Sequence, residues 1–188
     1  MESKILPIEK IIGYILDKNK SVLQSVSPTN AVSYSWGDQQ ELTSWILAKD
    51  DEIAGMRAFG NLNVAKYPLI WMVTPIDGLL QHDENLFENV TFIICSNTKA
   101  EWLNSTREAE TMPMLTDMAN LFLEVLTKDK NASIIRRDGH IKVKFRKVYN
   151  YSVSKGKESE TIDIWDAISL TFDLKINTNC LINLKLCL

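Results

Sequence analysis

Residues that could do chemistry gather most densely between Ser96 and Leu115, in the segment SNTKAEWLNSTREAETMPML. Trp102 lies there among charged side chains: Glu101, Arg107, Glu108 and Glu110. Two carboxylates beside an aromatic ring are the groups that glycosidases use. That reaction needs two facing walls of a cleft, whereas one continuous segment supplies only one wall. We therefore interpret the segment as the join between a strand and a helix.

Two residues of this join have more than one expected role. Trp102 is expected to pack in the core or to anchor an interface with a neighbouring subunit, because buried aromatic side chains dominate both environments. Arg107 is expected to pair with a nearby glutamate, Glu101 or Glu110, or with a partner chain.

The two histidines are the remaining candidates for a reaction centre. His82, in QHDEN, could form a small metal or acid–base cluster with Asp83 and Glu84, although adjacent residues of a loop rarely converge on one ligand. His140 follows Asp138-Gly139, a dipeptide typical of a hairpin turn. The sequence contains no glycine-rich phosphate loop, nucleophile elbow, HExxH or CxxC motif. We predict no enzyme activity, no cofactor and no metal, with an enzyme site around His82 as an alternative.

Basic side chains recur towards the C-terminal third of the chain: Arg136, Arg137, Lys142, Lys144, Arg146 and Lys147. On a strand, Lys142, Lys144 and Arg146 share one face. This face could contact a phosphate backbone, pair with an acidic face of a neighbouring subunit, or simply be solvated. Aromatic residues that would stack on bases are absent from it, which argues against sequence-specific recognition of nucleic acid. The net charge of −3 also argues against a dedicated nucleic-acid binder.

Composition limits the class of protein. A hydrophobic content of 45% in 188 residues is sufficient for one globular domain, residues 1–188. Three widely spaced cysteines are an odd number in apolar segments, which indicates reduced thiols rather than a disulfide framework. Charged residues interrupt the N-terminal apolar stretch, and no run reaches the ~20 apolar residues that span a bilayer. We expect a soluble intracellular protein without a membrane partner.

Hydrophobic periodicity predicts the elements that position these residues. The first half is expected to contain an amphipathic helix over about 5–18, a strand over 31–36, a helix over 39–49, an aperiodic connection, a buried strand over 67–75, an acidic surface loop over 76–89 and a strand over 89–95. A long helix follows over 112–128, with Thr111 as its N-cap.

Period-two alternation then predicts strands over 141–147, 168–177 and 182–188, with a flexible arm at about 150–163. The predicted fold class is α+β: an antiparallel sheet flanked on one face by the N-terminal helix and the long central helix, with a long β-hairpin arm.

Four segments together are similar to a known group of proteins: SYSWGDQQELTSWI, YPLIWMVTP, NTKAEWLNSTREAETMPMLTDMANLFL, and DIWDAISLTFDLKIN with NCLI. The chain resembles tail-completion or connector proteins of tailed bacteriophages, in particular those of crAss-like phages. The resemblance covers most of the chain. It implies a tail-terminator-like α+β domain that forms rings between portal and tail, holds the conduit for the genome and does no chemistry.

These inferences together give a predicted function. We expect a structural virion protein that forms a homo-oligomeric ring, sixfold or twelvefold, in the phage neck or tail, and that is present in the host cytoplasm during assembly. Its expected partners are the portal, other neck or tail proteins, and phage DNA passing through the lumen without sequence specificity. The expected interface residues are Trp102, Arg107, Lys142, Lys144, Arg146, Lys147, Tyr151, Lys155 and Lys157. A general protein-binding adaptor unrelated to viruses is a further alternative.

Overall fold

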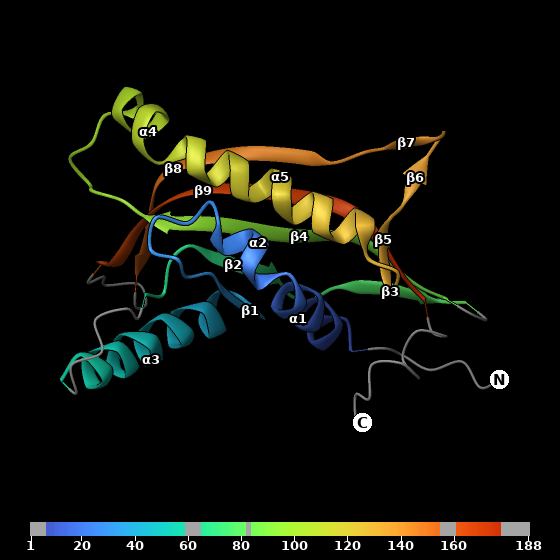
Figure 1. Ribbon diagram of the computed structural model, residues 1–188, viewed down its shortest axis with the longest axis horizontal. Helices are drawn as coiled ribbons and strands as arrows, with labels where there is room; N and C mark the ends of the chain where they lie inside the picture. The colour runs from blue at the N-terminus through green and yellow to red at the C-terminus, as the bar shows by residue number, and fades with distance from the viewer. Residues whose placement is uncertain (1–6, 59–64, 82–83, 155–160, 178–188) are drawn as a thin grey trace.

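The computed structural model describes residues 7–58, 65–81, 84–154 and 161–177. Its elements are α1 (Ile8–Lys18), α2 (Lys20–Gln24), β1 (Ser33–Gly37), α3 (Gln39–Ala58), β2 (Leu69–Val73), β3 (Asp77–Leu80), β4 (Glu84–Asn97), α4 (Asn104–Glu110), α5 (Met112–Lys128), β5 (Ala132–Ile134), β6 (Arg136–Arg137), β7 (His140–Ile141), β8 (Lys144–Ser154) and β9 (Thr161–Asn177). The fold is mixed α+β, as predicted, with helices packed on a sheet of several strands (Figure 1). No described helix is both long enough and apolar enough to cross a membrane.

The sheet is built around the two longest strands, β4 and β9. Its order is β1-β2-β4-β9-β5, with β3 also paired to β4 and β8 also paired to β9, and a separate hairpin pairs β6 with β7. All pairs are antiparallel except β1 with β2, which is parallel. The expected purely antiparallel sheet is therefore wrong at this edge. The chain passes through α3 between β1 and β2, and such a helical crossover allows two strands to run in the same direction.

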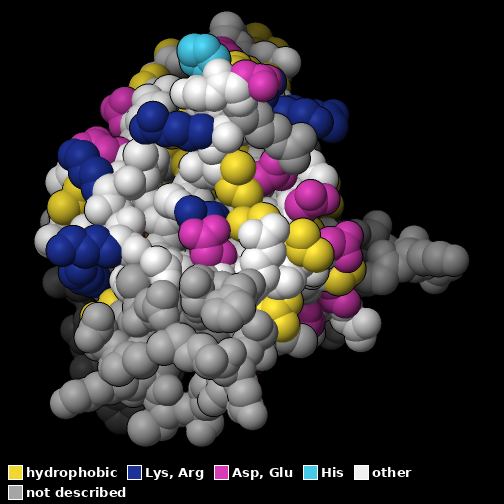
Figure 2. Space-filling model, turned by 90° about the vertical axis from the view of Figure 1, so that its right-hand side faces the viewer, with side chains coloured by type: hydrophobic (Ala, Val, Ile, Leu, Met, Phe, Trp, Pro, Cys, Tyr) yellow, Lys and Arg dark blue, Asp and Glu magenta, His cyan; other side chains and the backbone are white. Residues whose placement is uncertain are grey.

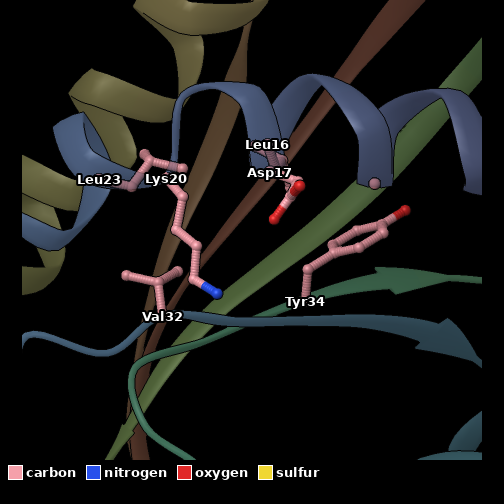
Figure 3. A pocket seen from close by; sticks show the side chains of 7 residues that line it. Leu16, Asp17, Lys20, Leu23, Val32 and Tyr34 are labelled. Atoms are coloured by element: carbon pink, nitrogen blue, oxygen red, sulfur yellow. The ribbon is translucent and has the colours of Figure 1, made fainter.

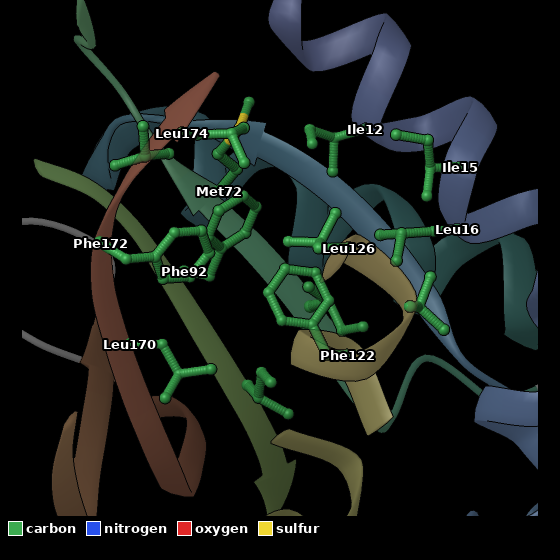
Figure 4. Packing of buried hydrophobic residues seen from close by; sticks show 14 of the residues in the cluster. Ile12, Ile15, Leu16, Met72, Phe92, Phe122, Leu126, Leu170, Phe172 and Leu174 are labelled. Atoms are coloured by element: carbon green, nitrogen blue, oxygen red, sulfur yellow. The ribbon is translucent and has the colours of Figure 1, made fainter. Parts of the chain in front are cut away.

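One face of the sheet carries the main core, under α1, α2 and α5. The stripes predicted from helical spacing are buried in both long helices: Ile8, Ile11, Ile12, Ile15 and Leu16 in α1, and Met112, Leu115, Met118, Ala119, Phe122, Val125 and Leu126 in α5. Phe122 meets Phe92 and Phe172 of the sheet at centroid separations of 4.8 and 6.5 Å (Figure 4). The placement of both helices on one face is confirmed.

The opposite face is also covered, which the sequence did not predict. Leu42 and Ile46 of α3 pack there with Trp71, Cys95 and other side chains that β2, β4 and β9 direct away from the main core. Alternation along β2 explains this, because Ile70 faces the main core whereas its neighbour Trp71 faces α3. β2 is consequently buried on both faces, as its uninterrupted apolar sequence indicates.

Two segments have more regular structure than expected. The acidic segment 76–89, predicted as a loop, forms β3 and the start of β4, because backbone pairing with β4 and β9 outweighs its weak strand propensity. The connection after residue 49 continues α3 as far as Ala58. Thr111 lies at the N-cap of α5, but its side chain makes no capping hydrogen bond, and α4 ends just before it.

The predicted arm is largely a β-hairpin. β8 continues to Ser154 and β9 begins at Thr161, so most of the segment 150–163 expected to be flexible pairs as two strands. The register shifts between Val148 and Tyr151, where Asn150 takes a positive φ of 53°. Such a bulge bends the strand. The rest of the predicted arm, 155–160, and the predicted strand over 182–188 lie outside the described residues.

Candidate assembly surfaces and buried polar sites

Arg107 lies inside the domain, although it was expected at an interface. Its side chain is 1% exposed, and Nη1 lies 2.8 Å from Oδ1 of Asp166, whose side chain is 0% exposed. The guanidinium donates further hydrogen bonds to the carbonyls of Trp102 and Lys99, at 3.0 and 2.6 Å. It also donates to Thr98 Oγ1 at 3.1 Å. Arg107 therefore fixes the path of the chain from β4 to α4 and cannot reach a neighbouring subunit.

Asp166 is the partner that the sequence analysis missed. Ile168, Leu170 and Phe172 of β9 face the main core, and alternation places Asp166 on that same face. A charged residue at an inward position of an apolar strand was the available signal, because a buried carboxylate requires a cation. Asp166 Oδ1 also accepts a hydrogen bond from the backbone N–H of Asn150, at 3.1 Å, and thereby fixes the bulge in β8.

The remaining predicted interface residues lie at the surface or outside the described part. Trp102 is half-buried, with the Lys99 ammonium 5.6 Å from its ring centroid. Tyr151 is exposed, and its ring centroid lies 6.1 Å from that of Trp165. Lys155 and Lys157 lie outside the described residues.

The basic side chains that follow β7 and begin β8 are exposed. Lys142, Lys144, Arg146 and Lys147 all lie at the surface. Lys147 Nζ lies 2.8 Å from both carboxylate oxygens of Glu108, which also accepts a hydrogen bond from the Tyr149 hydroxyl. These hydrogen bonds, that from Lys147 first, lower the pKa of Glu108, and the bond to Glu108 raises the pKa of Tyr149 to about 12.

Phe145 corrects the predicted orientation of this strand. Apolar and basic residues alternate in this segment, which predicted that Ile141, Val143 and Phe145 form a buried face. Phe145 is instead 73% exposed. α5 covers β9 and leaves the outer side of β8 open, so an open groove of about 240 Å³ remains between α5 and β8. Leu123, Val143 and Phe145 contribute apolar walls to this groove. An apolar groove beside an open strand edge is typical of surfaces that bind protein.

The end of the molecule that carries β6 and β7 bears charges of both signs. Figure 2 shows basic and acidic side chains interspersed over the described part of this face. Interspersed charges weaken long-range attraction for a polyanion. The described part of this end therefore lacks the continuous basic surface typical of a dedicated nucleic-acid binder.

A further group of polar side chains in the described part of the molecule lines a surface cleft. An open cleft of about 240 Å³ lies between the first two helices and β1. The side chains of Asp17 and Lys20 point from the helices towards β1, and the Tyr34 side chain points from β1 towards α1 (Figure 3). No hydrogen bond or ion pair between described residues joins Asp17 to Lys20. The Tyr34 hydroxyl donates to the Glu9 carbonyl at 3.0 Å, and burial raises its pKa. The cleft thus holds no paired nucleophile and base.

A second polar network connects the start of β9, in the β8–β9 hairpin, to the residues just before β2. Tyr67 donates to Asp163 Oδ2 at 2.6 Å and accepts from Trp165 Nε1 at 2.5 Å, while Lys66 Nζ lies 2.6 Å from the same carboxylate oxygen. Burial raises the pKa of the nearby Cys95 thiol, and a protonated, enclosed thiol is a poor nucleophile. These contacts are those of a structural clamp.

His82 and Asp83, the proposed centre of an enzyme site, lie outside the described residues. Among the residues that are described, no group of three or more His, Cys, Asp or Glu side chains is arranged to hold a metal ion. No protein-family model matches the sequence, and no curated protein is significantly similar to it.

Proposed function

We propose that this protein is a structural subunit of the neck or tail of a tailed bacteriophage, where copies of it assemble into a ring around the DNA conduit. The observation that carries the proposal is the open edge of β8, a strand of eleven residues that has an exposed Phe145 and an apolar groove beside it. Soluble proteins usually protect an edge of this kind, and one left open is suited to pairing with another chain.

The buried polar groups support a structural role for the rest of the chain. The Arg107–Asp166 pair and the Tyr67–Asp163 network form hydrogen bonds within the domain, to one another's side chains and to the backbone. They fix the β8–β9 hairpin to the body of the domain at two places. A rigid hairpin presents its edge in one orientation, which reduces the entropy lost on association.

The basic side chains beside the edge have two roles in this proposal. Lys144 and Arg146 steer the edge towards an acidic surface of a neighbouring subunit, portal or tail protein. Any of the basic side chains left facing the lumen contact the phosphates of passing DNA without reading its sequence.

The experiment measures the mass of the purified protein by native mass spectrometry, alone and mixed with a portal or tail protein from the same virus. Closed oligomers are expected, either alone or on the partner as template. The charge-reversed variant Lys144→Glu/Arg146→Glu should lose them, whereas Arg57→Glu, at the exposed end of α3, should not. A strict monomer under every condition, absent from purified virus particles, would refute the proposal.

A further inference from the structure

Each side of the sheet ends in two strands, β1 and β3 on one side and β8 and β5 on the other, and β1 and β8 are suited to pair with each other between two copies. Among the described residues β1 pairs only with β2, at one edge, and β8 pairs only with β9, at the other. The hydrogen bonds from Ser33 N to the Pro68 carbonyl and from Thr74 N to the Gly37 carbonyl face β2. Because backbone groups alternate in direction along a strand, those of Tyr34 and Trp36 point to the open side. β1 therefore offers donors and acceptors to a further strand.

Strand direction allows the two edges to join. β1 is parallel to β2, and the three following pairs, β2 with β4, β4 with β9 and β9 with β8, are antiparallel. β1 and β8 consequently run in opposite directions. When two copies lie side by side with the same face forward, β8 of one copy meets β1 of the next as an antiparallel pair, the more stable arrangement.

The register places an exposed aromatic side chain at each end of one row. Following the paired residues across the sheet gives Trp36, Met72, Phe92, Leu170 and Phe145. The three inner members are buried in the main core, whereas Trp36 is 42% exposed and Phe145 is 73% exposed. Both ends of a buried apolar row thus remain open to solvent, on the face that α1 and α5 cover.

The groove beside β8 provides room for the aromatic side chain of a second copy. It lies on the same face as Trp36, between α5 and β8, and has a volume of about 240 Å³. A Trp36 side chain entering it from the next copy would contact Phe145 and Leu123. Burial of one aromatic side chain removes about 150–250 Å² from water. The two exposed aromatics therefore cover each other in the joined sheet.

Charges next to the two edges are complementary. Continuing the row by one residue places Gly37 of the second copy opposite Lys144, and Asp38 follows directly after Gly37. Asp38 and Glu41 are exposed near β1, as Lys144 and Arg146 are on β8. No ion pair between described residues involves any of these four side chains. Pairing across the join would thus neutralise acids of one copy with bases of the next.

We infer that β8 of one copy pairs with β1 of a second copy, with Trp36 in the groove between α5 and β8, and that repetition of this contact closes the ring. The inference rests on the self-assembly part of the proposed function and specifies its interface. The contact joins two different surfaces of the same chain. Such heterologous contacts generate closed rings when the rotation between copies closes, whereas a contact of one surface with itself stops at a dimer.

Two edge variants test which surfaces meet. Trp36→Glu alters only the β1 edge and Phe145→Glu only the β8 edge, and both side chains are exposed, so both variants are expected to fold with wild-type circular dichroism. Each alone should be monomeric by native mass spectrometry. Their mixture should form a heterodimer and nothing larger, because one intact edge remains on each partner. A homodimer of either variant, or rings formed by either, would overturn the inference.

A disulfide test captures weak contacts. In the proposed register Ser35 lies opposite Arg146 of the other copy, and Cα atoms of antiparallel partners are about 4.5–5.5 Å apart, within disulfide reach. In a glutathione redox buffer, Ser35→Cys mixed with Arg146→Cys should give a covalent heterodimer. The matched mixture of Ser35→Cys with Lys128→Cys, on α5, should not. If the wild type forms rings but the mixture of Ser35→Cys and Arg146→Cys gives no disulfide-linked dimer, this interface is refuted and the proposed function is not. A wild type that neither assembles nor yields the link refutes the proposed function as well.

Discussion

Replacing Arg107 with methionine would leave Asp166 as a buried carboxylate without its cation. The two side chains are 1% and 0% exposed and lie 2.8 Å apart, so water cannot replace the lost partner without opening the structure. The carbonyls of Lys99 and Trp102 would lose a donor at the same time. Removing one member of a buried ion pair costs about 3–5 kcal/mol, compared with a total stability of about 5–15 kcal/mol for a typical domain.

The assay is equilibrium unfolding by denaturant, with a thermal melt beside it. In a chain of this size, each kcal/mol lowers the melting temperature by about 2–4 °C, so Arg107→Met should lower it by about 6–20 °C. The substitution Lys10→Met, at an exposed position of α1 away from both proposed edges, is the matched control and should shift it little. The double variant Arg107→Met/Asp166→Leu should lose less stability than Arg107→Met, because it leaves no buried charge.

Two results would refute this reasoning. One is a loss below about 1 kcal/mol for Arg107→Met, a value typical of a surface pair. The other is a double variant whose loss equals the sum of the two single losses, since strict additivity means that the two side chains do not interact.

Three further predictions concern the core, the surface and the thiol. Phe122→Ala should lower the free energy of unfolding by about 3–5 kcal/mol, measured by urea titration, because Phe122 is fully buried against other aromatic rings. Lys147 and Tyr149 lower the pKa of Glu108 in the folded protein below its pKa in the unfolded chain. The ionised Glu108 therefore stabilises the fold at pH values above the unfolded pKa, and this stabilisation is lost as the pH falls through the folded pKa. Glu108→Gln should therefore reduce the melting temperature at neutral pH and leave it unchanged in acid; equal shifts at both pH values would contradict this. Cys95, buried and protonated, should react with a thiol reagent only at the rate of unfolding, as followed by mass spectrometry of peptides containing it.

Much of the fold could be predicted from local patterns. The helix stripes of α1 and α5 and the alternation of β9 are periodic signals with a single interpretation, and the structure confirms them. The Asp138-Gly139 turn also forms the predicted hairpin, with both residues at positive φ. These features depend on neighbours within a few residues, which is the range over which sequence patterns are informative.

The errors occurred where distant pairing decides the outcome. β3 has little intrinsic strand preference and forms because β4 is available beside it. α3 extends past the predicted end at residue 49 to Ala58, and Ile53 is the buried apolar residue of this extension. Phe145 has the alternation of a buried side chain, yet α5 does not extend over it. Alternation specifies which residues share a face and leaves open whether anything covers that face.

The sequence by itself determined the fold class, the main helices, and the exposed basic side chains from Lys142 to Lys147, although the strand predicted over 141–147 is interrupted between β7 and β8. Only the tertiary structure decided that Arg107 is enclosed with Asp166, 59 residues away, instead of exposed to a partner. It alone aligned Trp36 with Phe145 at opposite ends of one row of the sheet. The physical reason is that periodicity records the orientation of each side chain relative to its own strand or helix. Burial, pairing and open edges depend instead on which other elements the folded chain brings beside it.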